Sequence, residues 1–166
     1  MHCDVGNGND PYMAGVTVSV QTVSSRKLAA VRRELSLKEI ASAWRPALDK
    51  VWAFLRTQPG LRTDGHNVFL YHHGRGAVAP MLVDFGVEVQ RAFDPVGDVY
   101  ATETPAGEVA LAMHVGRYDR LAETHASIHE WCAKQGRGLA EKSWEVYGDW
   151  MDDESQLETT VAYLLI

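Results

Sequence analysis

The sequence predicts an α+β fold built from two similar units, each with the element order ββαββ. Segments typical of strands occur in pairs before and after each of two amphipathic helical segments. This order occurs twice along the 166 residues, and similar residue patterns recur in both copies. Neither unit alone would bury much apolar surface. We therefore expect the two to join by pseudo-two-fold symmetry, with an antiparallel sheet, the helices on one face and a central cleft.

The first half is predicted to occupy about residues 15–95, after a flexible tail at residues 1–14 that is rich in Gly and Asn. Its helix begins with the pattern of a capping box, Ser36 followed three residues later by Glu39. Apolar residues then recur at helical spacing up to a Pro-Gly pair, which ends the helix. Strands are predicted at residues 16–23, 27–34, 67–72 and 81–93.

The second half, about residues 96–166, repeats this order. Trp52 in the first helix matches Trp131 in the second, and residues 69–71 match residues 146–148. We interpret residues 15–166 as a single domain made of the two half-repeats. The predicted elements of the second half are strands at 98–103 and 108–115, a helix at 118–135, and strands at 142–150 and 159–165.

Composition excludes several classes of protein. Hydrophobic residues make up 46% of the chain, enough for a core, but no run approaches the about 18 apolar residues of a membrane-spanning helix. There is no signal-peptide pattern and no CxxC pair, so we expect a cytoplasmic protein without a metal site, a cofactor or a membrane contact. Basic residues are scattered and the net charge is -6, so we expect no direct binding to nucleic acid.

Four segments carry a resemblance to a known family. Residues 109–121 contain the pattern HxGxY at the end of a predicted strand, and residues 143–149 contain the pattern E-x-Y within another. Residues 83–89 and 157–165 are similar to two further strands of the same family. Taken in their order along the chain, and on a duplicated ββαββ frame, the four segments resemble the GyrI-like small-molecule-binding domains over roughly residues 16–166.

The resemblance implies a function in ligand binding. The family includes effector-binding domains of AraC-type and MerR-type transcription regulators, and also free-standing proteins. In such domains the Glu of the E-x-Y strand, here Glu145, faces the cleft and pairs with cationic, aromatic ligands. Residues 1–14 are too short for a helix-turn-helix, so we expect a stand-alone protein that binds a small amphipathic or cationic aromatic compound in drug or toxin sensing or resistance. By analogy, a regulator or gyrase could be its protein partner.

Strand alternation suggests which side chains reach the cleft. Glu145 and Tyr147 share one face of their strand, and Trp144 and Val146 share the other. We expect the apolar pair to meet the helix and the polar pair to face the cleft. A carboxylate beside aromatic rings suits a flat cation, which ring faces also attract. Other aromatic residues are expected to line the cleft, although packing in the core is the alternative for each: Tyr71, Phe69, Tyr163 and Trp44.

Two other functions stay open at this stage. Some free-standing relatives are similar to hydrolases that open the cyclopropane ring of DNA-alkylating natural products. In that case Glu145 would activate water, and Tyr147, His114 or Glu88 would be the second proton-transfer group. The second alternative, inhibition of DNA gyrase by protein contact, rests on family analogy alone. His125 and His129 lie four residues apart on a predicted helix, but no third ligand accompanies them, so we expect no metal.

Overall fold

The computed structural model describes residues 16–74 and 80–166, so the predicted tail at residues 1–14 lies outside the described residues. Short 3-10 turns precede both helices and the last strand, at Leu37–Glu39, Tyr118–Arg120 and Glu154–Gln156. The elements are β1 (Val18–Val23), β2 (Lys27–Leu35), α1 (Ile40–Arg56), β3 (Arg62–His72), β4 (Met81–Val89), β5 (Val99–Glu103), β6 (Gly107–Val115), α2 (Leu121–Lys134), β7 (Leu139–Tyr147) and β8 (Glu158–Leu165).

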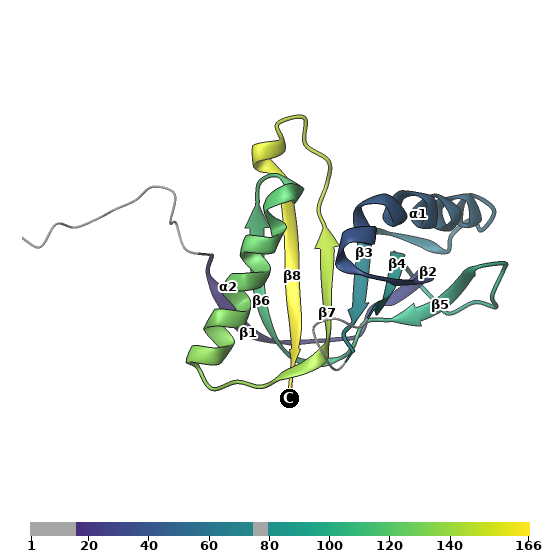
Figure 1. The fold of residues 1–166 in the computed structure, drawn as a ribbon. Helices are drawn as coiled ribbons and strands as arrows, with labels where there is room; N and C mark the ends of the chain where they lie inside the picture. The colour runs from purple at the N-terminus through teal and green to yellow at the C-terminus, as the bar shows by residue number, and fades with distance from the viewer. Residues whose placement is uncertain (1–15, 75–79) are drawn as a thin grey trace, which may run out of the picture.

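The described strands form an eight-stranded antiparallel sheet in the order β1-β6-β8-β7-β3-β4-β2-β5. Figure 1 shows β7 and β3 side by side in the middle, with α2 beside β6 and β8, while α1 lies against β2 and β4. The first strand of each half pairs with the other half, because β1 joins β6 and β5 joins β2. This exchange ties the two units into one sheet. The predicted α+β fold of duplicated ββαββ units is confirmed.

The register of the sheet locates the pseudo-two-fold axis. Asn67 in β3 and Ser143 in β7 occupy matching positions in the repeat. Asn67 pairs with a residue of β4 and Ser143 with a residue of β8, and these two partners match each other in the two halves. Two residues further on, Phe69 therefore corresponds to Glu145, and these two are also direct partners between β3 and β7. The axis thus passes between Phe69 and Glu145. The predicted match of residues 69–71 with residues 146–148 is wrong by one residue.

Both helices pack on the same face of the sheet. The buried residues of α1 recur at helical spacing and join side chains of β2 and β4 in one apolar cluster. Those of α2 join side chains of β6 and β8 in a second cluster. Each helix therefore covers the outer part of its own half-sheet. The two central strands, β3 and β7, lie between these covered regions.

The opposite face of the sheet carries a third apolar cluster, which includes Trp144 and Leu70. The linker between β1 and β2 contacts the linker between β5 and β6, where Arg26 N–H donates to Thr104 Oγ1 and Thr104 N–H donates to the Arg26 carbonyl. Ser24 and Ser25 of the first linker border a hollow beside Trp144. The prediction that Trp144 and Val146 would meet the helix is therefore wrong, because linkers rather than helices lie against that face.

Several boundaries also differ from prediction. Strand β3 begins at Arg62 rather than at residue 67, and β4 ends at Val89 rather than at residue 93. The strand predicted at residues 142–150 begins earlier and ends at Tyr147, whose partner Thr159 is the last pair between β7 and β8. The capping box does not form, because Ser36 Oγ donates to the Glu39 carboxylate (3.1 Å) rather than accepting from a backbone N–H, and a 3-10 turn opens the helix. Among the described residues, none of the helices is long and apolar enough to cross a membrane.

Candidate functional site

A cavity of about 800 Å³ lies over the two central strands. Its position follows from the packing of the helices, since each helix covers the outer strands of its own half. Among the helical residues, only those in the first two turns of α1 and α2 line the cavity. Its lining residues come from both halves: Leu37, Ile40, Ala41, Trp44, Arg45, Asn67, Phe69 and Tyr71 from the first, and Tyr118, Asp119, Leu121, Ala122, His125, Glu145, Tyr147, Gly148 and Trp150 from the second.

Glu145 is a buried carboxylate in the wall of this cavity, with only 3% of its surface exposed. The hydroxyls of Tyr71 and Tyr147 both donate to Oε1, the latter at 3.2 Å. Nε2 of His125 lies 3.2 Å from Oε2. These partners satisfy the carboxylate with neutral phenols and an imidazole, and no Lys or Arg pairs with it among the described residues. Its negative charge is therefore not neutralised by a fixed cation.

His125 links this carboxylate to a third phenol. Its Nδ1 lies 2.7 Å from the Tyr163 hydroxyl, so an uncharged imidazole satisfies both contacts when Nε2–H donates to Glu145 and Nδ1 accepts from Tyr163. Burial, together with the nearby Glu145 charge, raises the pKa of Tyr71 and of Tyr147 well above the usual value. Burial also raises the pKa of Tyr163 to about 12. All three phenols therefore stay protonated at neutral pH.

Aromatic rings form a continuous wall beside the carboxylate. The Phe69 ring lies 4.8 Å from the Tyr147 ring and 6.3 Å from the Trp44 ring, measured between centroids. On the other side of Tyr147, the Tyr118 ring lies 5.3 Å away at an edge-on angle. Such a wall offers apolar surface and electron-rich ring faces to a bound molecule. The arrangement can hold an aromatic, positively charged compound beside a buried negative charge.

Comparison with known proteins agrees with this geometry. A model of the GyrI-like small molecule binding domain matches residues 17–163. The chain belongs to the GyrI-like family. A comparison with curated proteins found no match for this GyrI-like chain.

Solved structures share the GyrI-like fold at low sequence identity. The C-terminal domain of EcmrR is 18% identical with a TM-score of 0.76, over 91% of this chain and 98% of that one. A structure of SAV2435 bound to tetraphenylphosphonium is 13% identical with a TM-score of 0.70, over 90% and 94% of the two chains. A hydrolase from Listeria innocua is 11% identical with a TM-score of 0.56, over 95% and 96%. At these identities the likeness concerns the fold.

The structure of this GyrI-like domain brings most of the predicted site residues together. Five of the six residues predicted to bind a ligand line the cavity: Glu145, Tyr147, Tyr71, Phe69 and Trp44. The sixth, Tyr163, lines a smaller adjoining lobe, in which it contacts His125. Tyr71 and Glu145 lie 74 positions apart in the sequence, and the pairing of β3 with β7 makes them neighbours.

His114, predicted as a second proton-transfer group, does not line the cavity. Its ring is buried at the end of β6, where Nδ1 lies 2.8 Å from Thr124 Oγ1 and Nε2 lies 2.8 Å from the Arg117 carbonyl. Because both nitrogens already have partners that hold the start of α2 against the sheet, His114 is a structural residue. We therefore drop it from the candidate site.

Three residues with aromatic side chains in the cavity wall were not foreseen as ligand contacts. His125 was considered only as a metal ligand, although it follows Leu121 by four positions and so lies on the buried face of α2. Tyr118 belongs to the HxGxY pattern, which could have pointed to it. Trp150 was predicted to continue β7, but it lies in the loop after that strand and is 64% exposed while lining the cavity. Local patterns carry little information about such loop positions.

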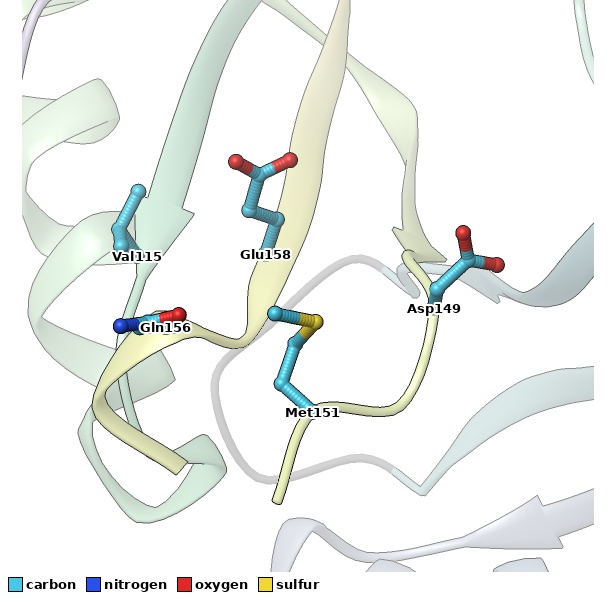
Figure 2. Close-up of a pocket in the computed structure, with 5 residues that line it drawn as sticks. All are labelled: Val115, Asp149, Met151, Gln156 and Glu158. Carbon is cyan, nitrogen blue, oxygen red and sulfur yellow. The ribbon is translucent and has the colours of Figure 1, made fainter. Parts of the chain in front are cut away.

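A separate hollow of about 420 Å³ lies beside the start of β8. Figure 2 shows Met151 in the loop between β7 and β8, with Asp149 in the same loop and Glu158 at the start of β8. The side chain of Asp149 is 89% exposed, so its charge is screened by water. The aromatic cavity is the stronger candidate, because its carboxylate is buried among rings.

Proposed function

We propose that this GyrI-like protein binds a small amphipathic or cationic aromatic compound in the cavity between its two halves, as a drug-binding or toxin-binding protein. The observation that carries the proposal is the buried Glu145 carboxylate, whose partners are two phenols and an imidazole and which lies beside about 800 Å³ of ring-lined space. This volume is in the range of small-molecule sites in proteins.

Electrostatics favour a cation whose charged centre carries no hydrogen-bond donors. The oxygens of the Glu145 carboxylate already have hydrogen-bond partners in Tyr71, Tyr147 and His125. A ligand that had to donate a hydrogen bond to this carboxylate would displace one of them. A lipophilic cation needs no such exchange, since its charge acts through space in a site of low polarity. The ring faces of Phe69 and Trp44 add cation–π attraction and apolar contact. Tetraphenylphosphonium, which SAV2435 binds in a similar fold, has these properties and is a suitable probe.

Replacing Glu145 tests this proposal. We expect Glu145→Gln to weaken tetraphenylphosphonium binding by about tenfold or more, because the amide keeps the shape but removes the charge, and a tenfold change corresponds to about 1.4 kcal/mol. Isothermal titration calorimetry measures the affinity, and circular dichroism checks the fold. Glu130→Gln is the matched control, since this exposed glutamate pairs with Lys134 on α2. Equal affinities of wild type and Glu145→Gln would remove Glu145 from the site.

Hydrolysis of an electrophilic ligand is the second candidate function. It is favoured by the proton-transfer groups around Glu145, since the Tyr147 hydroxyl lies 3.2 Å from Oε1 and His125 Nε2 lies 3.2 Å from Oε2. In cyclopropane opening, the oxygen of water bonds to a ring carbon as the strained C–C bond breaks. Glu145 would take the proton of water, and the neighbouring imidazole or phenol would protonate the electron pair released. The Listeria innocua hydrolase has a similar fold.

Product analysis separates the two functions. If the protein is a hydrolase, a cyclopropane-bearing alkylating compound gains one molecule of water in its presence, and mass spectrometry detects the adduct. We expect Glu145→Gln to abolish this gain and Glu130→Gln to preserve it. Product formation no faster than in buffer, at protein concentrations that bind the compound, would leave binding as the function.

A further inference from the structure

A second, smaller lobe adjoins the main cavity. It has a volume of about 380 Å³, and its mostly apolar lining is interrupted by the polar atoms of three histidines, Ser143 and two tyrosines. His73 directly follows β3, Ser143 lies in β7, and His129 lies in α2. The two lobes are adjacent because five residues line both: Leu37, Ile40, Tyr71, Ala122 and His125.

Three imidazoles surround Tyr163 in this lobe. His73 stacks parallel to the phenol ring at 6.0 Å between centroids, with an interplanar angle of 10°. His125 and His129 meet it edge-on at 5.6 and 4.8 Å. His73 follows the end of β3, and the other two lie in α2, so both halves of the molecule build the lobe. Chain segments far apart in sequence thus bring hydrogen-bonding rings to one place.

Several ring nitrogens in the lobe remain available to a ligand. Both nitrogens of His125 are used, by Glu145 and Tyr163, and His73 Nε2 lies 2.6 Å from the Ser143 hydroxyl. Nδ1 of His73 and both nitrogens of His129 have no hydrogen-bond partner among the described residues. A molecule that fills the lobe can therefore both donate and accept hydrogen bonds there.

These available imidazoles are uncharged at neutral pH. Burial, and secondly the positive charge that neighbouring imidazoles would carry, lower the pKa of both His73 and His129. A neutral imidazole offers one N–H and one lone pair, which suits a hydroxyl, carbonyl or amide. It offers no ionic attraction to a carboxylate, and the Glu145 charge next to the lobe repels anions. The lobe thus favours neutral polar groups.

We propose that this histidine lobe, lined by His73, His125, His129, Ser143 and Tyr163, is a subsite for a neutral hydrogen-bonding group attached to the aromatic cation in the main cavity. The inference rests on the proposed binding function and adds a chemical class to it. The ligand is an aromatic cation that carries a hydroxyl, carbonyl or amide group on a side ring. The volume of about 380 Å³ is large enough for one such ring.

Two probes that differ in one hydroxyl test the subsite: benzyltriphenylphosphonium and (4-hydroxybenzyl)triphenylphosphonium. Calorimetry at pH 7.5 measures both affinities. We expect wild type to bind the hydroxyl probe about fivefold more tightly, as one net hydrogen bond allows. In His73→Phe/His129→Phe, whose new rings can keep the ring contacts, we expect this preference to fall below about twofold. His129→Gln, which retains a donor and an acceptor, keeps part of the preference.

His66→Phe is the control, because His66 pairs with Asp149 and lines neither lobe; it should keep the full preference. Equal affinity of the two probes for wild type overturns the subsite and leaves the proposed function standing. An unchanged preference in the double phenylalanine variant also overturns it. Failure of wild type to bind either probe overturns the proposed function and the subsite together.

Discussion

Two buried carboxylates lie on opposite faces of the sheet, and their partners give them different properties. Asp84 is fully buried on the face away from the helices, where the Arg32 guanidinium contacts both oxygens at 3.0 Å and His72 Nε2 lies at 2.7 Å. Glu145 has only phenols and an imidazole around it. The charge of Asp84 is therefore neutralised within the fold, which suits a structural role. The charge of Glu145 remains available to a ligand.

Asp84 provides a test of stability at the residue scale. Burial alone would raise its pKa, but hydrogen bonds from His72 and Arg32 lower it to about 2. A carboxyl whose pKa is lower in the folded than in the unfolded state stabilises the fold above the unfolded value of about 3.9, and this contribution disappears as the pH falls towards 2. We expect Asp84→Asn to reduce the free energy of unfolding by about 1–3 kcal/mol at pH 7, since Arg32 is partly exposed.

Urea denaturation at pH 7 and pH 3 measures this effect. The difference between wild type and Asp84→Asn should shrink at pH 3, because the wild-type carboxyl loses much of its contribution there. Asp98→Asn is the control, since Asp98 pairs with Lys50 and Arg33 on the surface, where little stability is expected from an ion pair. A difference that stays the same at both pH values would contradict the assignment of the pH effect to Asp84.

At the scale of elements, strand β7 shows what alternation can and cannot predict. Glu145 and Tyr147 do share a face, because successive side chains in a strand point to opposite sides. The choice of face was argued wrongly, since Trp144 belongs to the apolar cluster on the face away from the helices and the polar pair lies on the helix side. The cavity exists on that side because neither helix covers β3 or β7. Apolar character identifies a buried face but not the element that buries it.

The histidines of α2 and the one that follows β3 should make ligand binding depend on pH. His73, His125 and His129 surround Tyr163 next to Glu145. As the pH falls below the lowered pKa of His73 and of His129, positive charge enters the cavity and repels a cationic ligand. Tetraphenylphosphonium should therefore bind more weakly at pH 5 than at pH 7.5, as measured by calorimetry.

Removing two imidazoles isolates their part in this effect. His73→Phe/His129→Phe should lose less affinity between pH 7.5 and pH 5 than wild type does, because fewer charges enter the cavity. His66→Phe should behave as wild type, since His66 lines neither lobe. The same loss of affinity in wild type and the double variant would assign the pH effect to other groups.

The whole molecule shows how near-symmetry produces a single charged site. The repeat makes Tyr71 the counterpart of Tyr147, and both hydroxyls donate to the same oxygen of Glu145. At the axis itself the symmetry is broken, because Phe69 occupies in one half the position that Glu145 occupies in the other. One ring therefore faces one carboxylate. Two glutamates at the axis would repel each other, and two phenylalanines would leave no charge for a cation.

The amino-acid sequence alone determined the order of the elements, the duplication, the alternation along each strand and the place of Glu145 beside Tyr147. These features depend on residues close together in the chain, which is why periodicity and the family patterns predicted them. Only the tertiary structure decided which face of β7 meets the helices and that His125, rather than His114, contacts Glu145. Such contacts depend on how distant segments pack, because each side chain competes for partners that its neighbours in the sequence do not reveal.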